Sequence, residues 1–245
     1  MAGSVLKRVL VLHGYSQNAV VFSKRLGALR KERKDLEFVF VNAPHILQAA
    51  EMFASEQASM ADTQSDPNTA LRGWWKANKE KTKVEGLEES LSLIRDVLKE
   101  QRFDLERPHL YPAFLEDGKP LHPPFQFCVA VSGFRLKDPF CDPVFEQKYT
   151  TPTLHVLGRT DVVVVEERSR SLVDVSANAR VEEHDGGHFV PSKGNWRKFL
   201  VNWMMDPSAP HFAPSTTSAM SQPGSGAATP VGTGADNKEA LLMKL

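Results

Sequence analysis

Short apolar runs alternate with amphipathic segments along most of the chain. The runs at 8–12 (RVLVL) and 36–41 (LEFVFV) are rich in β-branched, leucine and phenylalanine side chains, which is typical of buried strands. Between them, residues 20–31 carry apolar side chains at helical spacing. A strand, a helix and a second strand of these lengths predict a parallel pair joined by a crossover helix.

The alternation continues in the second half of the chain. Apolar residues of 86–101 recur with a helical period, which predicts a long amphipathic helix. Further strands are expected within 126–134, 151–161 and 180–188, and further helices over 168–177 and 195–205. This order of elements indicates the α/β class, with a mostly parallel sheet flanked by helices.

Two segments between these elements are irregular. Residues 48–72 are polar and poorly periodic, so we expect a surface excursion or lid. Residues 102–125 are rich in proline, which predicts no strand there. Of the adjacent Trp74 and Trp75, we expect one to pack in the core and the other to cover the rim of a pocket.

The composition changes after Asp206. Proline, serine, threonine, glycine and alanine dominate the remaining residues, which cannot bury enough apolar area to offset their ordering entropy. The sequence therefore predicts one domain over 1–205 and a disordered tail over 206–245.

The charge balance narrows the classes of partner. In 245 residues, Lys+Arg 30 balance Asp+Glu 30, so no global positive field favours nucleic acid or an anionic membrane. The first apolar run is too short to span a bilayer, and no membrane association is expected. Cys128 and Cys141 form no framework of disulfides, which predicts free thiols and a cytoplasmic location, with the nucleus as an alternative. No cofactor is expected, and the oligomeric state is left open.

Candidate chemistry gathers at the ends of two consecutive expected strands. Asp161 follows one strand in GRTD, and His188 follows the next in HDGGH, where Gly186 and Gly187 allow a tight bend. Since ligands of open parallel sheets bind at the carboxyl ends of the strands, these side chains are placed for a carboxylate–imidazole pair. The pair would leave the second ring nitrogen of His188 as a general base.

A histidine pair and two serines offer other candidate chemistry. A metal site on His184 and His188 is weaker, because their spacing shares a face only on a helix, and the glycines disfavour one. Ser16 follows the first strand in LHGYSQN but lacks the second glycine of G-x-S-x-G, so we interpret it as a loop hydroxyl. Ser132, in VAVSGF, is a weak candidate nucleophile that is better explained as a turn residue.

Five blocks of the sequence, in order along the chain, carry a family resemblance. They are VLVLHGYSQNAVVFSKRLGALRK, GWWKANKEKTKVEGLEESLSLIRDVLKEQ, HPPFQFCVAVSGF, PTLHVLGRTDVVVVEERS and HDGGHFVPS. These blocks resemble the fungal serine hydrolase family FSH, which comprises α/β-hydrolase esterases and thioesterases with animal relatives, and the resemblance extends over most of 5–204. It implies that Asp161 is the triad acid, that His188 is the triad base, and that the loop of Gly14 and Tyr15 contributes to the oxyanion hole. A small-molecule ester or thioester would be the ligand.

The chain departs from this family at one point. The family pattern places a strand, a G-F-S-Q-G elbow and a helix where Asp104 runs directly into Leu105. One average strand with a helix is roughly 20 residues. The expected nucleophile is thus absent between Asp104 and Leu105, and we expect this chain to be inactive or nearly so. A shortened product of an intact hydrolase gene is favoured over a non-catalytic pseudoenzyme or binding module that keeps the pocket.

Overall fold

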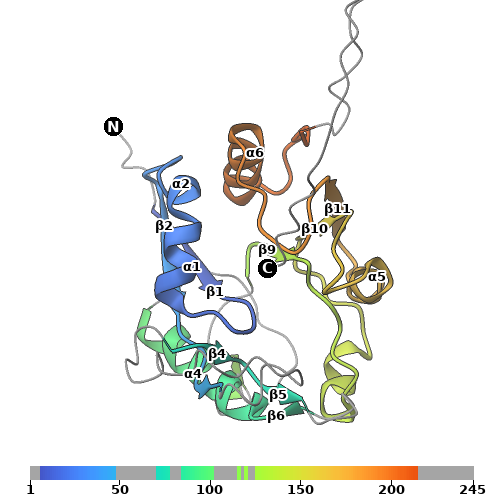
Figure 1. Cartoon of the computed structure of the whole chain (residues 1–245). Helices are drawn as coiled ribbons and strands as arrows, with labels where there is room; N and C mark the ends of the chain where they lie inside the picture. Colours follow the sequence, from blue (N-terminus) through green and yellow to red (C-terminus); the bar gives the residue numbers. More distant parts are fainter. Residues whose placement is uncertain are drawn as a thin grey trace, which may run out of the picture.

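The structure is a computed structural model that describes residues 6–47, 70–77, 84–101, 115–116, 119–120 and 125–214 (Figure 1). Three of the expectations above fall wholly or largely outside these residues. They are the lid over 48–69, the junction of Asp104 with Leu105, and the tail from 215 onward.

The N-terminal strands form the expected parallel pair. Strand β1 (Lys7–Leu12) pairs with β2 (Leu36–Val41) in a register that runs from Lys7↔Leu36 to Leu12↔Val41. The crossover contains two helices, α1 (Ala19–Arg25) and α2 (Gly27–Arg30), instead of the single helix expected over 20–31. Helix α1 begins at Asn18, whose side chain accepts a hydrogen bond from the Val21 amide at 2.8 Å.

The three later strands form a second parallel sheet, in the order β11-β10-β9. These are β9 (Cys128–Val131), β10 (Thr153–Gly158) and β11 (Ala179–His184). Helix α5 (Glu166–Val173) connects β10 to β11, and α6 (Gly194–Met205) follows β11. Within the described residues no strand pairing joins β1 to β9, so the parallel strands form two separate groups (Figure 1).

The rest of the described chain forms one long helix and several short elements. Helix α4 (Leu87–Gln101) confirms the predicted amphipathic helix. The pairs of two-residue strands are β3 (His45–Ile46) with β4 (Arg72–Gly73), β5 (Lys76–Ala77) with β6 (Val84–Glu85), and β7 (Leu115–Glu116) with β8 (Lys119–Pro120); a 3-10 helix spans Pro139–Phe145. The expectation of no strand in 102–125 is therefore wrong, because strands this short carry no hydrophobic period. No described helix is long and apolar enough to cross a membrane.

Helix α6 packs against both strand groups. Its buried Trp196, Leu200 and Trp203 share one apolar cluster with side chains of α2, β2 and β10. The Arg197 guanidinium also forms an ion pair with Glu32, at 3.2 Å, after α2. Hydrophobic burial on α6 thus connects the two groups in place of a continuous sheet.

The two strands at the break are less buried than the middle strand of the second sheet. Strand β10 is buried over Thr153–Leu157, whereas the apolar residues of β1 and β9 are mostly half-exposed. Runs such as RVLVL predict strands covered on both sides, and β1 is not covered to that extent.

The first residues of the expected tail have a place in the structure. After α6 the backbone turns at Asp206, and the Arg180 guanidinium donates to the carbonyl oxygen of His211. Ala213 packs against the core cluster. This stretch therefore lies along α6 and β11.

Candidate active site

The acid–base pair predicted from the sequence is present. Asp161 follows β10 and His188 follows β11, and because these strands are parallel neighbours their ends meet. The ring nitrogen Nδ1 of His188 lies 2.9 Å from Oδ2 of Asp161. The Asp161 side chain is 3% exposed and that of His188 is 41% exposed. Among the described residues, no hydrogen bond occupies Nε2 of His188, the nitrogen that a general base would use.

The Asp161 carboxylate is held on both oxygens. Its Oδ1 accepts hydrogen bonds from the backbone amides of Val163 and Val164, each at 2.9 Å. Burial raises the pKa of Asp161, but hydrogen bonds outweigh burial and hold this pKa below its ordinary value. The hydrogen bonds that the structure shows come from the Val164 amide, His188 and the Val163 amide, and the Ser132 hydroxyl lies near the carboxylate. The ionised carboxylate can therefore accept from Nδ1–H and fix the tautomer of His188.

The loop that carries His188 packs directly on the end of β10 at Gly158. A Cβ atom at Gly158 would lie 2.3 Å from the Gly187 carbonyl oxygen and 2.5 Å from that of Gly186. The Thr160 amide donates to the Gly186 oxygen at 3.2 Å. Since only glycine permits this approach, Gly158 sets the separation of the two loops that carry Asp161 and His188.

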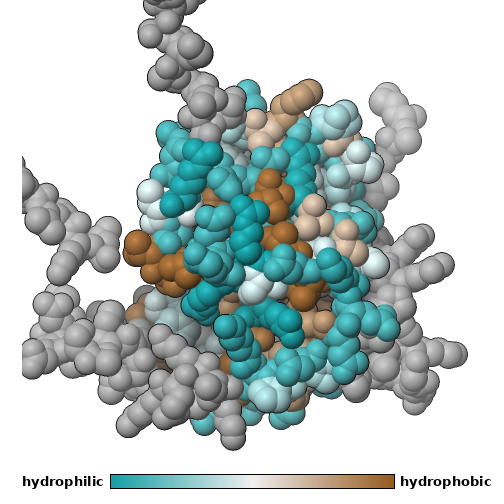
Figure 2. Space-filling view, turned by 90° about the vertical axis from the view of Figure 1, so that its right-hand side faces the viewer, coloured by the Kyte–Doolittle hydropathy of each residue, from teal (hydrophilic) through white to brown (hydrophobic). Residues whose placement is uncertain are grey.

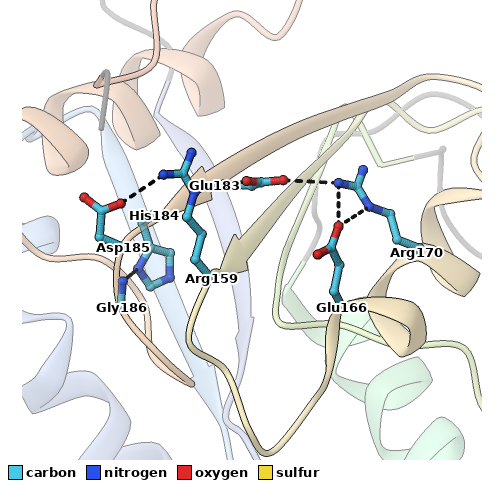
Figure 3. Close-up of polar contacts among 7 residues, drawn as sticks. All are labelled: Arg159, Glu166, Arg170, Glu183, His184, Asp185 and Gly186. Atoms are coloured by element: carbon cyan, nitrogen blue, oxygen red, sulfur yellow. Dashed lines mark hydrogen bonds and ion pairs between the residues drawn. The ribbon is translucent and has the colours of Figure 1, made fainter. Parts of the chain in front are cut away.

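Charged side chains tie the same loops to α5 (Figure 3). Arg159 pairs with Glu183 and Asp185, both at 3.2 Å, and Arg170 pairs with Glu166 at 2.9 Å and with Glu183 at 3.1 Å. Glu183 is shared by both guanidinium groups. The surface on this side of the molecule is mainly hydrophilic, with separate apolar areas (Figure 2). Each of these exposed ion pairs contributes little to the free energy of unfolding, so the network serves more to orient the loops than to stabilise the fold.

His184 does not join His188 in a shared site. Its Nδ1 accepts a hydrogen bond from the Gly186 amide at 3.1 Å (Figure 3). The centre of its ring lies 5.0 Å from that of Phe189 and 5.9 Å from that of Trp196. Burial lowers the pKa of His184. In the part of the chain that the structure describes, no group of three His, Cys, Asp or Glu side chains could hold a metal ion.

The proposed oxyanion loop is fixed from inside. The buried His13 ring donates from Nδ1 to the Gly14 oxygen at 2.8 Å, and its Nε2 accepts from the Ala43 amide at 3.0 Å. The indole N–H of Trp74 donates to the His13 oxygen at 2.8 Å, while Tyr15 is exposed. Trp74 is the buried member of the tryptophan pair, as expected, but its role in holding this loop carries no signal in the sequence.

The two candidate serines, Ser16 and Ser132, share an unusual backbone conformation. Ser16 has φ 54° and Ser132 has φ 49°, in the left-handed region. Ser16 lies in the loop after β1. Ser132 follows β9, is buried, and lies near the Asp161 carboxylate. No helix follows Ser132 directly. Ser16 lies in the connection between β1 and α1, but Gln17 and Asn18 follow it where G-x-S-x-G has its last two residues.

Comparison with known proteins shows the family of the chain. The sequence profile "Serine hydrolase (FSH1)" matches residues 3–104 and 109–200. The chain belongs to this family of serine hydrolases. It is 32% identical to "Esterase OVCA2" of Danio rerio, over 80% of this chain and 96% of that protein. It is also 30% identical to "Esterase CG5412" of Drosophila melanogaster, over 81% of this chain and 74% of that protein.

One relative is much longer. The chain is 32% identical to "Dihydrofolate reductase" of Schizosaccharomyces pombe over 85% of its own length, and it spans 48% of that protein. Solved structures similar in fold include Zea mays acyl-protein thioesterase 2, with a TM-score of 0.54, 14% identity, and coverage of 83% of this chain and 96% of that one. Esterase PE8 has a TM-score of 0.52 at 19% identity, with coverage of 82% and 94%. The α/β-hydrolase-like fold class is confirmed.

Proposed function

We propose that this chain is the shortened form of a carboxylic ester or thioester hydrolase, and that it lacks the nucleophilic serine. Asp161 orients His188 in this proposal, and the amide of Tyr15, in the loop after Gly14, stabilises the oxyanion. The names of the relatives and fold neighbours, esterases and an acyl-protein thioesterase, support a small ester or thioester as the ligand.

The observation that carries the proposal is an intact acid–base pair beside an interrupted sheet. Within the described residues β1 pairs with β2 alone and β9 with β10 alone, although both strands are apolar enough for the middle of a sheet. A parallel strand between β1 and β9 would make one continuous sheet. Its carboxyl end would place a serine near the ends that carry Tyr15 and Asp161.

The sequence comparisons support the position and size of the missing segment. The family profile matches in two parts that break between Asp104 and His109. The alignment with the Drosophila esterase extends over 219 residues but covers 81% of this 245-residue chain, which is about 198 residues. The difference is roughly the length of one strand and one helix.

Loss of the nucleophile has a large consequence for turnover. Removing the nucleophilic serine of subtilisin, a Ser-His-Asp enzyme, lowers the turnover rate about a millionfold. The missing elbow would also have supplied the second oxyanion donor, from the residue after the serine. We therefore expect little or no ester hydrolysis from this chain.

The test is labelling with a fluorophosphonate probe, together with turnover of a p-nitrophenyl ester. The purified chain should show neither. A chain with a strand–turn–helix containing G-F-S-Q-G inserted between Asp104 and Leu105 should show both, and its elbow Ser→Ala and His188→Ala variants should lose turnover. Labelling of the uninserted chain that disappears in Ser132→Ala or Ser16→Ala would overturn the proposal.

A non-catalytic binding module is the second candidate. Exposed apolar side chains flank the acid–base pair: Val162 is 87%, Val163 61% and Phe189 54% exposed, which suits a retained apolar ligand. This function predicts cooperative unfolding whose midpoint rises with an uncleavable ester analogue. A molten chain without ligand-dependent melting would exclude it.

The free thiols of Cys128 and Cys141 support the proposed cytoplasmic location, with the nucleus as an alternative.

A further inference from the structure

Ser132 combines three features that the proposed mechanism does not use. It follows β9 directly, it adopts a left-handed φ of 49°, and it is only 6% exposed. A serine rarely adopts this backbone, because the region favours glycine, asparagine and aspartate. The surrounding structure therefore dictates where the Ser132 side chain points.

The Ser132 hydroxyl is buried without a fixed partner. Its amide donates to the Val156 oxygen at 2.9 Å, so the backbone is already satisfied by β10. Its Oγ has no hydrogen-bond partner among the described residues. Because buried hydroxyls are nearly always paired, an orphaned one indicates an interaction that a small rotation can complete.

The Asp161 carboxylate is the acceptor within reach. Parallel pairing of Val131 with Val156 brings the end of β9 beside the end of β10, where the Asp161 amide closes a turn onto Gly158 at 3.1 Å. The carboxylate accepts two hydrogen bonds at Oδ1 and one at Oδ2, which leaves a lone pair on Oδ2.

We propose that Ser132 is a positioning residue, whose hydroxyl donates to the Asp161 carboxylate and holds it toward His188. A rotation about its Cα–Cβ bond brings the hydroxyl hydrogen onto the carboxylate. The inference rests on the proposed function only for the catalytic role of the pair. Ser132 is not itself placed as a nucleophile, because an attacking serine bonds to Nε2 of the base, and among the described residues no hydrogen bond joins the buried Ser132 hydroxyl to His188.

The test is carbon-13 NMR of the Asp161 carboxyl group during a pH titration of the full chain. Two variants remove the hydroxyl, Ser132→Ala and Ser132→Gly. In both, the pKa of Asp161 should rise by about half a unit to one unit, because one donor to the charged form is lost. Asp161 has two titratable neighbours. His188 bonds to its carboxylate, and the charge of that carboxylate acts to raise the pKa of His184. Both histidines are kept in the two variants.

Ser132→Gly separates positioning from backbone strain. Glycine adopts the left-handed region freely, so a purely structural role predicts an unaltered or more stable fold with the same Asp161 titration. Ser16→Gly is the matched control, because it relieves the same kind of strain, at φ 54°, in the loop after β1. It should leave the Asp161 pKa unchanged.

An Asp161 pKa in Ser132→Gly equal to that of the unmodified chain would overturn the proposal. If both variants at position 132 fail to fold, a measurement on the unmodified chain tests the proposal. A slowly exchanging Ser132 hydroxyl proton that couples to the Asp161 carboxyl carbon supports the proposal, and its absence rejects it. These measurements need no nucleophile, so their failure is distinguishable from a failure of the fluorophosphonate test.

Discussion

Replacing Gly158 with alanine puts a methyl group where the backbone of the His188 loop lies. The new Cβ would sit 2.3 Å from the Gly187 oxygen, 2.5 Å from the Gly186 oxygen and 2.9 Å from the Gly187 carbonyl carbon. Carbon–oxygen contacts need more than 3 Å, so the loop must retreat by about 1 Å. His188 is the next residue, and its Nδ1 lies 2.9 Å from Asp161. The same displacement takes this pair beyond hydrogen-bond distance.

Gly158→Ala should therefore cost both stability and the tautomer of His188. Overpacking of this kind costs about 1–3 kcal/mol. In a chain of this size each kcal/mol lowers the melting temperature by about 2–4 °C. Nitrogen-15 NMR should show a single Nδ1–H tautomer of His188 in the unmodified chain and a mixture in the variant. Circular dichroism gives the melting temperature.

Gly27→Ala is the control, since a Cβ at Gly27 meets no atom within 4 Å. It should leave the His188 tautomer unchanged and keep stability or raise it by a few tenths of a kcal/mol, about what glycine-to-alanine exchange yields. The reasoning is refuted if Gly158→Ala keeps a single tautomer and melts within a degree or so of the unmodified chain.

Three further perturbations follow from the same contacts. Because the folded pKa of Asp161 lies below its ordinary value of 3.8, its contribution to stability is complete above that pH and disappears as the pH falls through the folded pKa; Asp161→Asn should flatten acid unfolding curves in that range. Trp74→Phe removes the donor to the His13 oxygen and should cost about 1 kcal/mol, seen in urea titrations, with Trp75→Phe as the milder control. Arg159→Ala should change stability by less than about 1 kcal/mol in low salt and by nothing measurable in 1 M salt, since its side chain is 49% exposed; a larger, salt-independent loss would show that the guanidinium does more than pair with Glu183 and Asp185.

The acid–base pair could be located from the sequence because its geometry follows from topology. Asp161 and His188 come directly after consecutive apolar strands, and parallel strands bring such ends together whatever the side chains between them. The glycines of HDGGH signalled a bend, and the structure shows why they are there. The long helix α4 was likewise predicted, because its period is a local property.

The contacts that hold these residues in place could not be predicted from the local sequence pattern. Trp74 and His13 are far apart in the chain, and no periodicity connects an indole N–H with the carbonyl oxygen that it reaches. The approach of Gly187 to Gly158 depends on how two loops pack after the strands have paired. The division of the crossover into α1 and α2 at Leu26 also depends on packing, since Leu26 is buried in the core beside α6.

Hydrophobic period, turn residues and strand order were sufficient to determine the α/β class and the position of the acid–base pair, since each depends on residues adjacent in the chain. The junction where a serine is expected followed from the resemblance to the FSH family. Tertiary structure alone decided that the strands form two groups connected by α6, that Gly158 sets the separation of the loops that carry Asp161 and His188, and that Ser132 lies near Asp161. These depend on distances between segments remote in sequence, which are settled only when burial of the shared core brings them together.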